Sequence, residues 1–206
     1  MFASAYSRIR NHRGPAAIAA LAMLHGCATP SGVMLPPLDD WHTRQQVLGA
    51  VRDWSFSGRL AVSDGEDGFN GKLRWRQERQ HFDAELSGPL GAGRVEISGN
   101  GRRVTVTEKD GSVTVLANAE RDLRARYGWS IPVASLRYWA LGIPDPALPA
   151  AAGFGDDGLL RTLAQGGWQV TIDEYRDGGG QPMPRRMTAL NAGTRVRLVI
   201  DHWIFR

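Results

Sequence analysis

The feature that most constrains the fold of this chain is the alternation of large apolar and polar side chains in many short segments. In residues 54–63 the large apolar side chains occupy even positions, and in residues 71–76 they occupy odd positions. The same two-residue period recurs at 82–86, 95–97, 104–106, 113–115, 159–163, 168–172, 187–190 and 196–200. Because successive side chains of a strand point to opposite faces, this pattern predicts strands with one apolar and one polar face.

Turn clusters and two short helices separate these strands. Clusters rich in Gly, Asp and Asn at 64–68, 99–101 and 109–111 predict tight connections, so the first six strands form a meander. Asn118 can cap a helix that runs to Tyr127 and ends at Gly128. Pro132 can open a second helix that runs to Leu141 and ends at Gly142. A loop rich in Pro, Ala and Gly then leads to the remaining strands.

A third helix is predicted before the first strand, capped by Asp39 or Asp40 and running to about Val51. Its apolar face would hold Trp41, Leu48 and Val51, and its polar face Arg44, Gln45 and Arg52. With 206 residues, 42% of them apolar and 22% charged, the chain suits a single globular domain. The simplest packing is a curved antiparallel sheet with the helices against its apolar concave face.

The N-terminal segment has the pattern of an export signal. Arg8, Arg10 and Arg13 precede an uncharged apolar stretch at 16–24, which is shorter than the about 20 residues that a permanent membrane span needs. The sequence Leu24-His25-Gly26-Cys27 that follows resembles the lipobox of bacterial lipoproteins, although His25 departs from the small residue found there. In that motif the cysteine receives a diacylglyceryl group and becomes the first mature residue. The alternative is that Cys27 is an ordinary small residue of a secretory signal.

These features predict three parts: a signal peptide at 1–26, a lipidated tether at 27–38 and one folded domain at 39–206. The tether contains three prolines and has no sustained period. An aspartate directly after the cysteine tends to retain such lipoproteins at the inner membrane, and this chain has Ala28. The resemblance therefore implies a lipid anchor at Cys27 in the outer membrane of a Gram-negative bacterium, with the domain facing the periplasm.

Composition argues against several classes of function. The chain has 25 Lys and Arg against 21 Asp and Glu, and removal of three arginines with the signal leaves 22 against 21, which is too balanced for a nucleic-acid-binding protein. One cysteine and five histidines give little from which to build a disulfide framework or a zinc site. There is no P-loop, dinucleotide fingerprint, G-x-S-x-G or H-E-x-x-H. We therefore expect no cofactor, no metal and no enzymatic activity.

The segment from Ser87 to Gly93 is the most informative loop. It contains Gly88, Pro89 and Gly91, which disfavour a strand, yet its largest side chain is the aliphatic one of Leu90. Leu90 either folds back onto the sheet or projects into a partner or a bilayer, and the residues alone leave both possibilities open.

Together with this loop, residues 129–144 and the final Asp201-His202-Trp203-Ile204 resemble the LolB family from about Trp41 to the C-terminus. The helix that runs from Ile131-Pro132 to Leu141-Gly142-Ile143-Pro144 is the most specific part of the match. The resemblance implies a mainly β, unclosed antiparallel barrel with a helical lid over an apolar cavity. It also implies a receptor that accepts acylated lipoproteins from the periplasmic carrier LolA and inserts them into the inner leaflet of the outer membrane. Gly88, Pro89, Leu90 and Gly91 would then form a membrane insertion loop.

The expected partners are LolA, the acylated lipoprotein cargo and outer-membrane phospholipid, with the receptor acting as a monomer. Candidate acyl-chain contacts are the large side chains of the apolar faces: Phe56, Leu60, Leu73, Trp75, Phe82, Leu86, Ile97, Leu136 and Trp139. The same side chains would also suit an ordinary filled core. Arg137, in the lid, is expected to face outward or to pair with a carboxylate.

Two other functions remain open at this point. The first is a membrane-anchored lipid or acyl hydrolase, for which Ser87 and His81 are the candidates, although His81 beside Asp83 and His202 beside Asp201 suit solvated surface positions. The second is a structural outer-membrane lipoprotein with a filled core.

Overall fold

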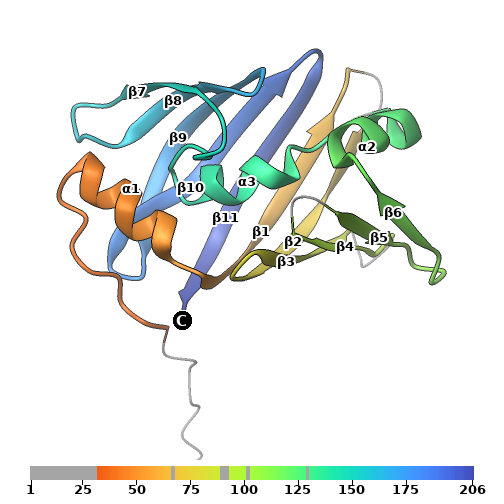
Figure 1. Ribbon diagram of the computed structural model, residues 1–206, viewed down its shortest axis with the longest axis horizontal. Helices are drawn as coiled ribbons and strands as arrows, with labels where there is room; N and C mark the ends of the chain where they lie inside the picture. Colours follow the sequence, from red (N-terminus) through yellow and green to blue (C-terminus); the bar gives the residue numbers. More distant parts are fainter. Residues whose placement is uncertain (1–31, 66–67, 89–92, 101–102, 129) are drawn as a thin grey trace, which may run out of the picture. The chain divides into compact units, whose positions relative to one another are not determined.

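The computed structural model describes residues 32–206 except 66–67, 89–92, 101–102 and 129 (Figure 1). Three helices accompany the sheet: α1 (Trp41–Ala50), α2 (Ala119–Tyr127) and α3 (Val133–Ala140). The strands are β1 (Asp53–Ser63), β2 (Gly68–Glu78), β3 (His81–Ser87), β4 (Val95–Gly99), β5 (Val104–Thr107), β6 (Val113–Leu116), β7 (Ala150–Phe154), β8 (Leu160–Gln165), β9 (Trp168–Gly178), β10 (Gln181–Asn191) and β11 (Thr194–Phe205).

All eleven strands belong to one antiparallel sheet in the order β6-β5-β4-β3-β2-β1-β11-β10-β9-β8-β7. The first and last strands of the chain pair at its centre, with Trp54 opposite Phe205, and β6 and β7 form the two edges. The helices lie across one face of this curved sheet (Figure 1). The predicted unclosed antiparallel barrel with a helical cover is confirmed.

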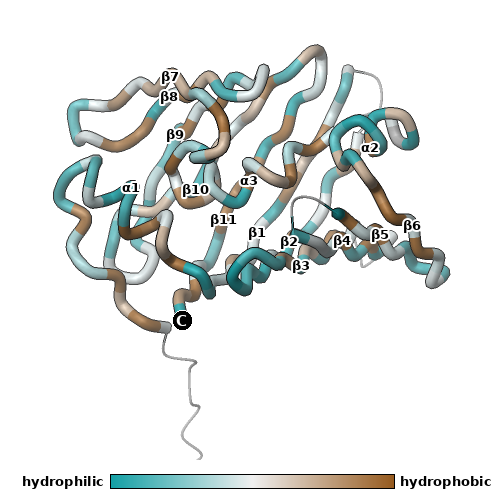
Figure 2. Tube along the Cα trace, in the orientation of Figure 1, coloured by the Kyte–Doolittle hydropathy of each residue, from teal (hydrophilic) through white to brown (hydrophobic). Residues whose placement is uncertain are grey.

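The two-residue period places large side chains on the covered face, as expected. In β1, Trp54, Phe56, Leu60 and Val62 are buried, and polar and apolar residues alternate along the strands (Figure 2). The exception is β7, which the sequence predicted as loop. Its residues Ala-Ala-Ala-Gly-Phe are mostly exposed and carry no alternation of large side chains, because this strand serves as a sheet edge against β8 and not as a core strand.

The prediction that Arg44 lies on the polar face of α1 is wrong. The helix begins after the cap Asp40, as expected, but Arg44 is only 1% exposed. Trp41, Arg44 and Leu48 follow the i, i+3, i+7 spacing of a single helical face, so Arg44 is carried inward with its apolar neighbours. Its guanidinium lies 5.7 Å from the centre of the Tyr175 ring, and its Nη2 donates to the Pro182 carbonyl. Burial lowers the pKa of this guanidinium.

The N-terminus of α2 is closed by a reciprocal pair of hydrogen bonds. The Asn118 side chain accepts from the Arg121 backbone N–H at 3.0 Å, and the Asp122 carboxylate accepts from the Asn118 N–H at 3.0 Å. These bonds satisfy two of the donors that a helix start leaves unpaired.

We expect Asn118→Ala to destabilise α2 by about 1 kcal/mol, because the substitution removes the cap acceptor. Hydrogen exchange of the α2 amides is the suitable measurement, since a short helix opens locally. Asn118→Asp keeps an acceptor at the same position and should exchange like the wild type. Unchanged exchange in the alanine variant would contradict this account of the helix start.

Candidate functional site

The candidate site is the apolar space between the concave face of the sheet and the lid helix α3. A void of about 20 Å³ remains there. Its lining consists of buried apolar residues from β1 to β4 and from the start of the lid: Leu60, Leu73, Trp75, Phe82, Ala84, Leu86, Ile97, Ile131, Val133 and Leu136. Seven of the nine side chains expected to contact acyl chains are among them.

The volume of this void shows whether the site is open or closed in this structure. A space of about 20 Å³ suits about one water molecule, whereas pockets for small molecules occupy roughly 300 to 1,000 Å³. The interior is therefore closed, and an acyl chain can enter only if the lid or the sheet moves.

Phe56 and Trp139 do not line the void. Phe56 belongs to a cluster of rings with Trp54, Trp75 and Trp203, at centroid separations of 5.2 to 6.2 Å. The Trp139 indole Nε1 instead donates to Gln165 Oε1 at 2.9 Å. The pattern of apolar residues in the sequence predicts that both side chains are buried, but it does not predict which residues they contact.

A buried polar network joins α3 to β8, chiefly at the C-terminal end of the helix. Gln165, which is 3% exposed, accepts from Trp139 Nε1 and from the Asp145 backbone N–H, and donates to the Asp145 and Leu148 carbonyls at 2.9 and 3.0 Å. The Asp145 carboxylate in turn accepts from the Ser135 hydroxyl at 2.8 Å. Neither Gln165 nor Asp145 could be predicted as part of the site, because hydrogen bonds between segments distant in the chain leave no periodic signal in the sequence.

The other end of the lid meets the void through apolar side chains. Ile131, Val133 and Leu136 point into it, and glycines with left-handed backbone lie on both sides of α3: Gly128 at φ 77° and Gly142 at φ 75°. A Cβ atom at Gly142 would also lie 2.9 Å from Pro184 Cγ. The backbone can change direction at these two glycines, one before and one after α3. The Gln165 network holds the C-terminal end of the helix in place.

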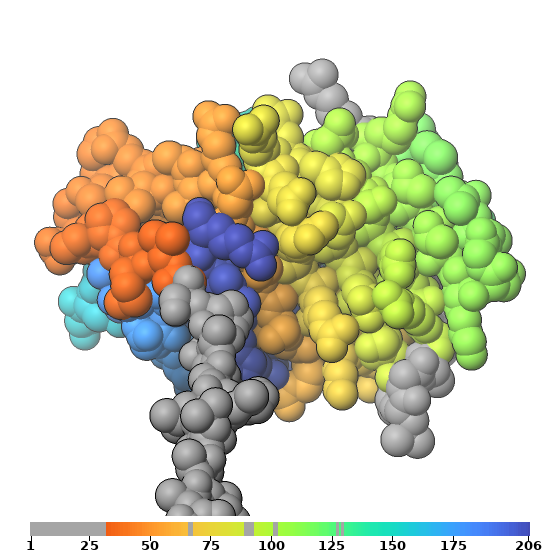
Figure 3. Space-filling model, turned by 90° about the horizontal axis from the view of Figure 1, so that it is seen from below, coloured from red at the N-terminus to blue at the C-terminus, as the bar shows by residue number. Residues whose placement is uncertain are grey.

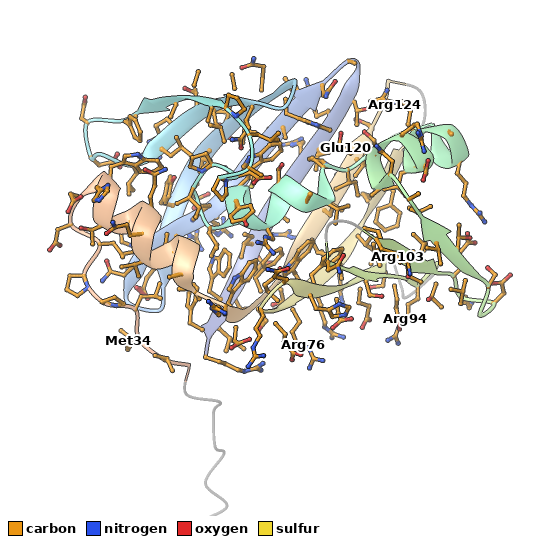
Figure 4. All side chains as sticks on the ribbon, in the orientation of Figure 1. Met34, Arg76, Arg94, Arg103, Glu120 and Arg124 are labelled. Carbon is orange, nitrogen blue, oxygen red and sulfur yellow. The ribbon has the colours of Figure 1, made fainter. Side chains whose placement is uncertain are left out.

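Helix α2 is attached to the start of the central strand β11 by a side-chain hydrogen bond. Arg124 Nη2 donates to Thr194 Oγ1 at 3.2 Å, and Glu120, one turn earlier, is half-buried on α2 (Figure 4). Burial raises the pKa of the Glu120 carboxyl, against smaller opposing effects from the Trp168 indole and from Arg124.

The raised pKa of Glu120 predicts a pH dependence of stability. The pKa of Glu120 is higher in the folded than in the unfolded state. Its contribution to the free energy of unfolding is therefore fully present below the unfolded-state pKa and is lost as the pH rises through the folded-state pKa. Glu120→Gln keeps the group neutral, so the variant should gain stability relative to the wild type between about pH 4 and about pH 7. Urea denaturation of both proteins at the two pH values measures this. If the free energies of unfolding of the variant and the wild type differ by the same amount at both pH values, the pKa of Glu120 is not raised.

The residues predicted for the insertion loop and for a hydrolase lie at or beyond the ends of strands. Gly88 is buried directly after β3, whereas Cys27, Pro89, Leu90 and Gly91 lie outside the described residues. His81 and His202 are exposed, as expected. Ser87 and His81 occupy opposite ends of β3, about 20 Å apart along an extended strand, so they cannot act together as nucleophile and base.

Arg137, which was expected either to face outward or to pair with a carboxylate, forms no ion pair within the described residues. Its Nη2 donates to the Tyr138 hydroxyl, and its guanidinium lies 4.4 Å from the centre of the Tyr138 ring. The side chain is half-buried and borders a second pocket, described below. Its cation thus contacts the aromatic ring and hydroxyl of Tyr138.

Comparison with known proteins identifies the family. Residues 52–203 match the family described as "Outer membrane lipoprotein LolB". The chain belongs to the LolB family. "Outer-membrane lipoprotein LolB" of Nitrosococcus oceani is 39% identical over 189 residues, which cover 89% of this chain and 92% of that one. The LolB protein of Cellvibrio japonicus is 32% identical over 192 residues, 91% and 94% of the two chains.

Family membership makes the protein an outer-membrane lipoprotein. Among solved structures, a DUF1329 family protein from Desulfovibrio piger aligns with a TM-score of 0.54 at 7% identity and covers 79% of this chain and 89% of that one, which is a likeness of fold alone. In the part of this LolB chain that the structure describes, no helix is long and apolar enough to cross a membrane.

Proposed function

We propose that this chain accepts acylated lipoproteins from the carrier LolA and passes them to the inner leaflet of the outer membrane. It does so as a monomeric binding protein that makes and breaks no covalent bond and needs no cofactor. The observation that carries the proposal is the void with a wholly apolar lining beneath a lid that is held chiefly at its C-terminal end and bounded by two left-handed glycines.

Energetics explain why such an interior is needed. A lipoprotein anchor has three acyl chains with on the order of 40 methylene groups, and each costs about 0.8 kcal/mol when it is exposed to water. Spontaneous transfer through water would therefore cost tens of kcal/mol. An interior that supplies apolar contacts throughout removes most of this barrier, so affinity that rises from carrier to receptor to bilayer suffices without a nucleotide.

The proposed opening follows from the unequal attachment of α3. Moving the C-terminal end would break the buried bonds of Gln165 with Trp139 and Asp145, each costing about 1 to 3 kcal/mol if left unpaired. At the other end, Ile131, Val133 and Leu136 can exchange contacts with the sheet for contacts with acyl chains, and the buried bond from Ser135 to Asp145 is the polar contact that has to break. We therefore propose that the N-terminal end of α3 moves outward.

The remaining parts of the chain have roles in the same proposal. Residues 1–26 are removed as a signal peptide, and Cys27 is acylated and anchors the domain that begins near residue 39. Leu90, in the segment with Gly88, Pro89 and Gly91 that follows β3 in the sequence, enters the acyl region of the membrane and opens a path for the cargo. Entry of one leucine contributes about 1.5 to 3 kcal/mol, which is enough to bias an encounter but not to anchor a protein.

The test is transfer of an acylated lipoprotein from purified LolA to the unacylated chain carrying Cys27→Ala, followed by release to liposomes. We expect a one-to-one complex with this chain and then appearance of the cargo in the liposomes. A filled-core structural lipoprotein, which the small void would also suit, should take up no cargo, and that result would contradict the proposal.

A further inference from the structure

A second pocket, of about 180 Å³, lies at the tethered end of the sheet. Arg52 from the junction of α1 and β1, Arg79 from the β2–β3 turn and Arg137 from the lid all border it. None of the described residues that line this pocket is acidic. In the described part of the chain none of these three arginines forms an ion pair with a carboxylate. Three cations around one pocket repel each other unless an anion joins them.

The backbone around the pocket is fixed. The Arg79 N–H donates to the Arg52 carbonyl at 2.8 Å, and the buried Gln77 side chain donates to the Arg79 carbonyl at 3.0 Å. Arg79 has a φ of 54°, which is uncommon for a residue other than glycine and is maintained here by these bonds. The turn therefore holds Arg79 at the pocket although the conformation is unfavourable.

The pocket also lies at the end of the domain where the described part of the chain begins. Trp54 lines it and is paired with Phe205, whose carbonyl accepts from the Val33 N–H at 2.9 Å. From below, the α1–β1 segment, the β2–β3 turn and the end of β11 lie side by side (Figure 3). Six residue steps from Cys27 to Val33 reach at most about 22 Å, so acylation of Cys27 would hold this end close to the membrane surface.

We propose that this pocket binds the phosphate group of an anionic membrane phospholipid. Arginine is the side chain best suited to phosphate, since its planar N–H groups can form paired hydrogen bonds with two oxygens. Because Arg137 belongs to the lid, a bound headgroup would contact the lid and the strand ends together. The choice of a lipid as the source of the phosphate rests on the proposed acylation of Cys27.

The test uses the unacylated chain with Cys27→Ala and vesicles of phosphatidylcholine with and without phosphatidylglycerol. We expect Arg79→Gln and Arg137→Gln each to weaken binding to the phosphatidylglycerol vesicles about fivefold. Arg103→Gln, which removes an exposed arginine that does not line the pocket, should change it less than twofold. Short-chain phosphatidylglycerol should shift the guanidinium NMR signals of the three pocket arginines, and the matched diacylglycerol should not.

Three results would overturn the proposal. If Arg79→Gln, Arg137→Gln and Arg103→Gln weaken vesicle binding equally, the binding depends on general surface charge and not on the pocket. If inorganic phosphate shifts the guanidinium signals but the pocket variants bind vesicles like the parent chain, free phosphate is the ligand. Unchanged vesicle binding with lost transfer from LolA would assign the pocket to an acidic protein partner. Acceptance of cargo by the parent chain, measured in the same preparation without vesicles, tests the proposed function separately.

Discussion

Replacing Gln165 with alanine should lower the free energy of unfolding by at least about 3 kcal/mol. The side chain serves three buried groups, the Trp139 indole and the N–H and carbonyl of Asp145, and also donates to the part-buried Leu148 carbonyl. Each unpaired buried group costs about 1 to 3 kcal/mol, and partial relaxation recovers some of the total. Urea denaturation at neutral pH measures the change.

Gln169→Ala is the matched control, because Gln169 is an exposed glutamine on the adjacent strand β9. It should change stability by less than about 0.5 kcal/mol. We also expect faster hydrogen exchange in α3 of the Gln165 variant, since the attached end of the lid is released. If Gln165→Ala and Gln169→Ala unfold at the same urea concentration, the network does not hold the lid.

Leu90→Glu should slow delivery of cargo to liposomes at least tenfold while leaving folding and acceptance from LolA unchanged. The leucine gains about 1.5 to 3 kcal/mol in the acyl region, whereas a carboxylate is costly there, and about 1.4 kcal/mol corresponds to a factor of ten. The measurement separates the two steps by first loading the chain with cargo and then adding liposomes.

Leu190→Glu provides the control for charge alone. Leu190 is a 42% exposed leucine on β10, outside the loop, so the same substitution there should leave delivery at the wild-type rate. Delivery by Leu90→Glu at the wild-type rate would show that Leu90 has no role in insertion.

The sequence predicts most of this fold because large apolar side chains at every second position can be buried on only one face of a sheet. The prediction fails where that signal is missing, as in β7, whose alanines and glycine pair with β8 without contributing a core face. It also fails at Arg44, because a positive charge was assigned to the polar face although the helical spacing places it beside Leu48.

The site is less predictable than the fold. Periodicity identifies Leu60, Leu73 and Leu136 as inward-facing, but free volume depends on how side chains from distant segments fit together, and no local pattern contains that information. The same limit applies to Gln165, which meets Trp139 only because β8 and α3 pack together. The structure supplies these contacts and shows that the interior is closed.

In the proposed function, this closed interior opens to hold acyl chains. The most direct measurement is titration of the unacylated chain, carrying Cys27→Ala, with a fluorescent fatty-acyl probe, combined with hydrogen exchange of the lid. We predict saturable uptake into an apolar environment, with faster exchange at Val133 and Leu136 than at Trp139 and Ala140. No saturable uptake, with exchange in α3 unchanged at excess probe, would contradict it.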